Sequence, residues 1–146
     1  MRFNKIILRK KIYTHLMHHG KKSTCEKVFL KALKTLQKET QKNHKSLIQT
    51  AIVNTTPTIQ LKQIKKKKRK TIKEFPFVLN KKNRMTQSIK SILLITNSRP
   101  KNKFFINFPE EILLTSNLKS NILKTKEIKH TEALLKKKYT FFRWFC

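Results

Sequence analysis

Residues 16–36, LMHHGKKSTCEKVFLKALKTL, predict two helices joined by a basic corner. Gly20 supplies the left-handed backbone conformation that commonly ends a helix. Ser23 and Glu26 follow in the spacing of a capping box, in which each side chain accepts a hydrogen bond from a free amide at the start of the next helix. Lys21 and Lys22 occupy the corner. Apolar residues then recur at the i, i+3, i+4 and i+7 positions of one helix face, namely Phe29, Ala32, Leu33 and Leu36.

Helical patterns continue on both sides of this corner. We expect a first helix over residues 5–19, a third over residues 44–55 that Pro57 ends, and a fourth over residues 84–97 that Pro100 breaks. Few helix-breaking residues interrupt the chain, since it has one glycine and four prolines. Long helices are therefore expected to dominate the fold.

Two more helices are predicted towards the C-terminus. Pro109 and the acidic pair Glu110 and Glu111 indicate a helix start, because proline suits the first helical position and acids suit the positive end of the helix dipole. The last helix is expected over residues 125–143. Its aromatic cluster at residues 139–145 has helical spacing, so we expect it to pack in the core rather than to enter a membrane interface.

Between the third and fourth helices, the period changes from that of a helix to that of a strand. Residues 59–62 (IQLK) and 72–79 (IKEFPFVL) carry apolar residues separated by polar ones. Six consecutive cations, residues 65–70 (KKKKRK), stand between these stretches. We therefore expect a two-stranded β-ribbon over residues 58–79 with the cations at or near its tip. Because an isolated ribbon is barely stable, it must lie against the helices or a ligand.

Basic residues outnumber acidic ones by a wide margin. The chain has 36 lysines and arginines against 7 glutamates and no aspartate, which gives its 146 residues a formal net charge of +29. Charge of this density repels itself and opposes compaction, so we expect the folded protein to coexist with a polyanion. Basic side chains that neutralise phosphates release counterions, which gives a salt-sensitive affinity for nucleic acid.

The residues offer no motif for catalysis, for a metal or for a cofactor. The sequence GKKS at residues 20–23 is similar to the end of a phosphate-binding loop. That motif needs a glycine where His15 stands and a hydroxyl residue where Lys22 stands. His15 and His19 have the spacing of metal ligands on a helix, but the glutamate of a zinc protease does not follow His15. We therefore expect neither an enzyme nor a metal or cofactor site.

Two classes of protein compete with an RNA-binding one. A cationic membrane-surface protein would partition onto anionic vesicles, and a nuclear DNA-binding protein would prefer duplex DNA to RNA. The longest apolar run, residues 92–95, is far shorter than the roughly 20 residues of a membrane helix. We therefore expect no membrane partner.

Four stretches, in order along nearly the whole chain, resemble small-subunit ribosomal protein seven. They are Leu16-Met17-x-x-Gly20-Lys21-Lys22-Ser23-Thr24-x-Glu26 with Ala32-Leu33, then Ala51-x-x-Asn54-x-x-Pro57-Thr58-Ile59, then Phe75-Pro76-Phe77, and finally His130, Lys137 and Tyr139 leading to Phe142-Arg143-Trp144. The resemblance implies a single domain over residues 1–146 that is mainly α. It would be a bundle of about six helices with a protruding two-stranded β-ribbon, which agrees with the elements predicted above.

The resemblance also implies a function, that of a structural constituent of a small ribosomal subunit that nucleates and holds the head of the subunit. Members of the family bind small-subunit rRNA through a basic amino-terminal arm (residues 1–11 here), the corner after the first helix, the ribbon and the segment that leads into the fourth helix. Matched by position, the candidate rRNA-binding residues are Lys10, Lys11, Lys21, Lys22, Lys62, Lys65, Lys66, Lys67, Lys68, Arg69, Lys70, Lys81, Lys82 and Arg84.

Partners and location follow from the same resemblance. The ribbon of the family points towards the exit-site tRNA and the mRNA path, and its neighbours are the ninth, eleventh and thirteenth small-subunit proteins. Abundant lysine, isoleucine, asparagine and phenylalanine indicate an A+T-rich genome. Family-like sequence begins within the first helix, which leaves no room for a cleaved presequence. We therefore expect translation inside an organelle, a mitochondrion in the first place and a plastid in the second.

Overall fold

The computed structural model describes residues 5–41, 43–65, 72–99 and 103–145. Their elements are, in order, α1 (Lys5–Leu16), α2 (Lys22–Thr40), α3 (His44–Thr55), β1 (Ile59–Lys65), β2 (Ile72–Val78), α4 (Lys81–Ser98), α5 (Phe104–Ser116), α6 (Asn121–Leu135) and the 3-10 helix η1 (Lys137–Phe145). The expected fold class, mainly α with a two-stranded antiparallel ribbon, is confirmed.

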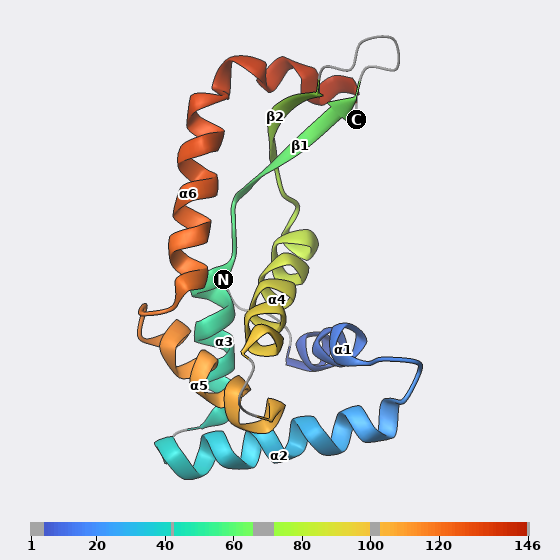
Figure 1. Cartoon of the computed structure of the whole chain (residues 1–146), viewed down its shortest axis with the longest axis vertical. Helices are drawn as coiled ribbons and strands as arrows, with labels where there is room; N and C mark the ends of the chain where they lie inside the picture. Colours follow the sequence, from blue (N-terminus) through green and yellow to red (C-terminus); the bar gives the residue numbers. More distant parts are fainter. Residues whose placement is uncertain (1–4, 42, 66–71, 100–102, 146) are drawn as a thin grey trace.

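The molecule is elongated, with the helical bundle at one end and the ribbon at the other (Figure 1). α2 runs across the far end of the bundle. α6 leaves the bundle and runs towards the ribbon, where η1 packs against β2. The corner between α1 and α2 therefore lies at the opposite end of the molecule from the end of β1 at Lys65 and the start of β2 at Ile72.

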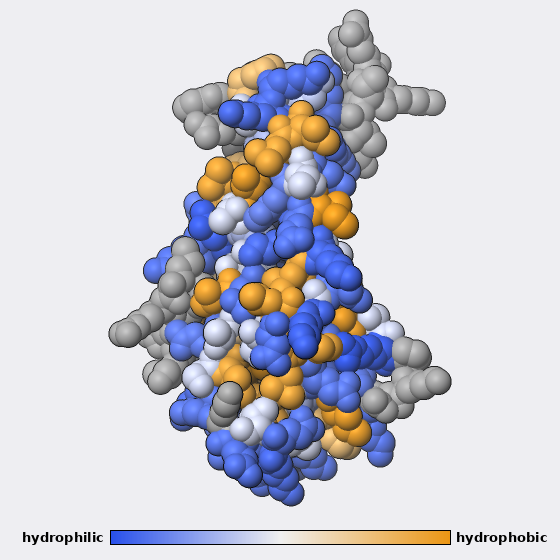
Figure 2. Space-filling view, turned by 90° about the vertical axis from the view of Figure 1, so that its left-hand side faces the viewer, coloured by the Kyte–Doolittle hydropathy of each residue, from blue (hydrophilic) through white to orange (hydrophobic). Residues whose placement is uncertain are grey.

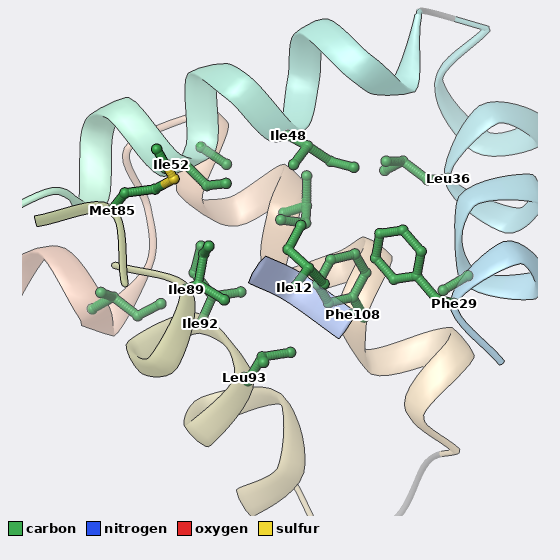
Figure 3. Close-up of a cluster of buried hydrophobic side chains, with 14 residues drawn as sticks. Ile12, Phe29, Leu36, Ile48, Ile52, Met85, Ile89, Ile92, Leu93 and Phe108 are labelled. Atoms are coloured by element: carbon green, nitrogen blue, oxygen red, sulfur yellow. The ribbon is translucent and has the colours of Figure 1, made fainter. Parts of the chain in front are cut away.

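Side chains from α1, α2, α3, α4 and α5 form a continuous hydrophobic core (Figure 3). The apolar face predicted for α2 supplies part of it, with Phe29, Ala32 and Leu36 buried and Leu33 partly buried. The ring of Phe29 contacts the rings of Tyr13 and Phe108 edge-on, at centroid distances of 5.3 and 5.7 Å. These contacts lock α1, α2 and α5 together, since edge-on aromatic pairs add to the gain from burial.

The start of α2 corrects one expectation. Gly20 is left-handed as predicted, with a φ of 71°. The Lys22 amide donates to the Gly20 carbonyl at 2.8 Å, and this tight turn starts the helix before Ser23 is reached. Ser23 and Glu26 therefore lie inside α2, and the predicted capping box is wrong.

Pro109 corrects a second expectation, because it lies inside α5 rather than at its start. Proline has no amide hydrogen, so the carbonyl of Phe105 loses its helical partner. The Thr35 hydroxyl of α2 lies 2.9 Å from that carbonyl oxygen and can donate to it. The same hydroxyl is 2.9 Å from the Ala32 oxygen, which already has the Leu36 amide as its helical partner. A neighbouring helix thus replaces the hydrogen bond that the proline removes.

Four further helix boundaries differ from the sequence prediction. α1 ends at Leu16 rather than at residue 19, and α4 begins at Lys81 rather than at residue 84. α6 starts before residue 125 because the Ser120 hydroxyl accepts a hydrogen bond from the Ile122 amide at 3.1 Å and caps the helix. Instead of continuing to residue 143, α6 ends at Leu135, and η1 follows.

The ribbon lies against the helical part, as its low intrinsic stability requires. Phe75 of β2 is buried. Glu74 pairs with Lys136 and accepts a hydrogen bond from the Gln63 side chain at 2.8 Å. These two hydrogen bonds, with that from Lys136 the stronger influence, hold the pKa of Glu74 below its usual value.

Of the aromatic cluster expected in the core, Tyr139 is partly buried but Phe141 is 58% exposed, so the prediction is wrong for Phe141. The side chains of Phe142, Trp144 and Phe145 lie outside those that the structure describes.

A buried carboxylate in the middle of α5 joins the end of α4 to the start of α6. Glu111 of α5 is 1% exposed. It accepts hydrogen bonds from Nη2 of Arg99, at 2.5 Å, and from the hydroxyl of Ser120. Since Arg99 follows α4 and Ser120 caps α6, one side chain fixes α4, α5 and α6 relative to one another. The remaining arm of Arg99 contacts Glu110 at the surface, at 3.0 Å.

Candidate nucleic-acid interface

The corner lysines lie at the start of a helix. Lys21 is the N-cap residue of α2 and Lys22 is the first residue of the helix, and both are exposed. The first amides of a helix have no partner within it and carry a partial positive charge. The Lys22 amide already donates to the Gly20 carbonyl, but no side-chain hydrogen bond from Lys21 satisfies the amides that follow it, and the first turn contains no acidic residue. Amides and ammonium groups therefore favour an anion at the same place.

The start of α4 repeats this arrangement. Asn80 is the N-cap residue but makes no side-chain capping bond, and Lys81 and Lys82 follow, both exposed. Nε of Arg84 donates to the Leu79 carbonyl at 2.8 Å, which ties the helix to the base of the ribbon. A guanidinium has five N–H donors. Arg84 can therefore hold the ribbon with one donor and offer others to a phosphate.

Lys10 and Lys11 have different surroundings, although they are neighbours in α1. Lys10 is exposed. Nζ of Lys11 donates to the Lys82 carbonyl at 3.1 Å and to the Thr86 hydroxyl at 3.0 Å. Lys11 thus binds α1 to the start of α4. Residues 5–11 of the predicted basic arm are helical.

On the ribbon, the structure describes one predicted side chain. Lys62 is exposed and its Nζ lies 4.1 Å from the centroid of the Phe77 ring. This cation–π contact holds the ammonium group over a flat aromatic surface. Lys65 ends β1, and the other predicted cations of the tip lie outside the described residues, namely Lys66, Lys67, Lys68, Arg69 and Lys70.

Helix starts divide into two kinds in the part of the chain that the structure describes. Asn43 and Ser120 cap α3 and α6 with their side chains. The N-cap residues of α2, α4 and α5 make no side-chain capping bond, and each of these starts carries lysine at the N-cap or the first helical position. Lys103, at the start of α5, was not among the predicted residues. Of these five helix starts, the three without a side-chain cap are the three that carry lysine at the N-cap or the first helical position.

Two lysines serve the fold rather than the surface, and sequence reasoning did not separate them from the others. Nζ of Lys126 donates to the Asn54 carbonyl at 2.8 Å, and burial lowers the pKa of this lysine. Lys136 holds Glu74. The sequence alone does not distinguish Lys126 or Lys136 from the other lysines, because the partner of each lies far away along the chain.

The histidines of the corner do not form a metal site within the described ranges. His15 is partly buried, and its pKa is lowered by burial and then by the charges of Lys90 and Lys11. No group of three or more histidine, cysteine, aspartate or glutamate side chains that could hold a metal ion occurs among the residues that the structure describes.

The surface is consistent with a polar partner. The face in Figure 2 is mostly hydrophilic, with hydrophobic residues in separate patches. Among the described helices, none combines the length and the hydropathy needed to cross a membrane.

Known proteins with similar sequences are ribosomal. A family model described as Ribosomal protein S7p/S5e matches residues 1–137. Small ribosomal subunit protein uS7 of Trichormus variabilis is 24% identical over 133 residues, which cover 91% of this chain and 84% of that protein. The protein of the same name from Afipia carboxidovorans is 24% identical over 143 residues, covering 98% of this chain and 90% of the relative. That of Mycoplasma mobile is 27% identical over 142 residues, covering 97% and 89%.

Proposed function

Because the chain belongs to the ribosomal protein S7p/S5e family, whose members are structural proteins and not enzymes, we propose that it holds folded small-subunit rRNA by neutralising phosphates at several separate surfaces. The relatives bear the name of a small ribosomal subunit protein. Contacts at both ends of an elongated molecule would join RNA helices that are far apart, which suits a protein that nucleates and holds the head of the subunit.

One observation carries this proposal. The predicted rRNA-binding lysines that the structure describes include those at the starts of α2 and α4, and both starts lack a side-chain cap. Lysines at a helix start are unfavourable in the isolated protein, because their charge has the same sign as that end of the dipole. An RNA phosphate reverses this, since it accepts hydrogen bonds from the free amides and pairs with the lysines.

The test is the salt dependence of RNA binding. We expect replacement of Lys21 and Lys22 by alanine to weaken binding to small-subunit rRNA. The slope of log affinity against log salt should fall by about 1.4–1.8, because each lost phosphate contact contributes about 0.7–0.9. A matched control is replacement of Lys34 and Lys38, which are exposed on the same helix beyond its first turn. An unchanged slope for the Lys21 and Lys22 variant would contradict the roles of these two residues. An equal fall in slope for the Lys34 and Lys38 variant would contradict them as well.

Finer partners belong to the same proposal. The cationic ribbon is expected to reach the exit-site tRNA and the mRNA path, and the neighbouring proteins are expected to be those of the ninth, eleventh and thirteenth small-subunit families. Cross-linking of the intact subunit, followed by identification of the peptides linked to the ribbon and to the bundle, tests these contacts. Links to none of the three neighbours would reject this arrangement.

We further propose that the ribosome is that of an organelle, most simply a mitochondrion. The support is compositional, since abundant lysine, isoleucine and asparagine accompany 1 glycine and 4 prolines. Sedimentation of an organellar extract tests it. Migration with organellar small subunits agrees with the proposal, and recovery with cytoplasmic or bacterial subunits contradicts it.

A further inference from the structure

A groove of about 310 Å³ opens beside the corner. It lies between the turn that joins α1 to α2, the first turns of α2, the end of α4 and the start of α5. Its lining residues are Leu16, His18, His19, Lys21, Thr24, Cys25, Val28, Asn97 and Phe104. It shares Lys21, the N-cap residue of α2 assigned above to rRNA, and extends from there to Phe104 of α5.

The walls of this groove differ in chemistry. A cationic or polar part of the lining consists of Lys21, His18 and His19, and all three residues are exposed. An apolar wall consists of Val28 and the aromatic ring of Phe104. No carboxylate is among the described residues that line it. Such a groove suits a ligand that is flat and apolar at one end and anionic at the other.

The aromatic wall is held firmly in place. The ring of Phe104 stacks on that of Phe108 at a centroid distance of 5.3 Å and an interplanar angle of 23°. Phe108 is itself buried in the core. The groove is open on the side of the corner, where its lining residues Lys21, His18 and His19 are exposed. A partner can therefore reach it from the corner.

We propose that this groove holds one unstacked nucleotide of the bound RNA, with its base against Val28 and Phe104 and its phosphate near Lys21. The inference rests on the proposed function and refines it. Contacts to a duplex backbone alone would leave the apolar wall exposed to water, whereas an extruded base would cover it. Base stacking on aromatic side chains is a common way of binding unpaired RNA. The amide of Asn97 offers both a donor and an acceptor to the edge of the base.

The test compares two probes of equal charge. One is a fluorescent hexauridylate, and the other is the same backbone without bases. The intact protein should bind the first about tenfold more tightly, as expected for one stacked base. Val28→Trp fills the groove and should abolish this preference. Ile106→Trp is the matched control, because Val28 and Ile106 are each 37% exposed and Ile106 does not line the groove.

The outcomes separate this inference from the proposed function. Equal binding of the two probes by the unaltered protein, or a preference that survives Val28→Trp, would overturn the nucleotide site. The salt-dependent binding of rRNA would stand in either case. The ring signals of His18 and His19 in NMR spectra provide a second measurement that needs no variant. They should shift more with the hexauridylate than with the abasic probe, and equal shifts would also overturn the site. A groove that instead takes an acidic peptide would leave both probes indistinguishable.

Discussion

Replacement of Glu111 by alanine is expected to cost more stability than any other single carboxylate change in the described part of the chain. The side chain is 1% exposed, and it accepts hydrogen bonds from Arg99 and Ser120. Alanine would leave the buried Ser120 hydroxyl and one arm of Arg99, whose side chain is 32% exposed, without their partner, and it would leave a void. Breaking a fully buried ion pair from one side costs about 3–5 kcal/mol. Because solvent reaches Arg99, we expect a loss at the lower end, about 3 kcal/mol.

Glu110 provides the control, because it contacts the other arm of the same arginine. The side chain of Glu110 is 45% exposed, and its oxygen lies 3.0 Å from Nη1 of Arg99. An exposed pair of this kind contributes about 0–1 kcal/mol. The two alanine variants thus remove the same charge from adjacent positions, and burial is the main difference between them. The expected gap between them is about 2–3 kcal/mol.

Urea unfolding followed by circular dichroism measures both free energies. A domain of this size is typically stable by about 5–15 kcal/mol, so the Glu111 variant should remain foldable but lose a large share of its stability. In thermal unfolding, each kcal/mol should correspond to about 2–4 °C. Moderate salt should be present in both experiments to screen the net charge of +29. Two variants that unfold within about 1 kcal/mol of each other would refute the assignment of Glu111 as the residue that joins three helices.

Three further outcomes follow from the geometry. The pairing of Glu74 with Lys136 lowers the pKa of Glu74 below its ordinary 4.5. The contribution of this pair to the stability of the ribbon should therefore be complete above pH 4.5, and it should be lost as the pH falls through the pKa of Glu74 in the folded protein. Hydrogen exchange in the ribbon would report this loss. Glu74→Gln should remove this pH dependence, and its persistence would point to another group. Thr35→Val should cost about 1–3 kcal/mol in urea unfolding, because the Phe105 carbonyl is left without a donor, whereas no loss would mean that water replaces the hydroxyl. Gly20→Ala should cost about 1–2 kcal/mol through the left-handed backbone alone, and a neutral result would show that the corner can change its conformation.

Local patterns in the sequence predicted the parts of the fold that depend on neighbouring residues. The period of Phe29, Ala32 and Leu36 identified the buried face of α2, and the change of period after Pro57 located the ribbon. Gly20 was correctly assigned a left-handed conformation. Each of these signals acts over a few residues, so it is visible without knowledge of the fold.

Several errors arose where a distant residue decides the structure. Pro109 signals a helix start when read alone, but a hydroxyl 70 residues away from Phe105 accommodates it inside α5. Distant partners also limited the prediction of the rRNA-binding residues. Lys11 could be placed in a basic arm but not recognised as a link to Thr86, because that partner is 75 residues away. The groove beside the corner was missed for the same reason, since Phe104 comes from another part of the chain.

The hydrogen bond from Thr35 to Phe105 has a consequence for how this sequence can change over time. While proline occupies position 109, substitutions at position 35 should be restricted to residues that carry a hydroxyl, serine and threonine. Once the proline is exchanged for a residue with an amide hydrogen, position 35 becomes free to drift. An alignment of descendants should therefore show these two positions covarying, although neither side chain need touch the other.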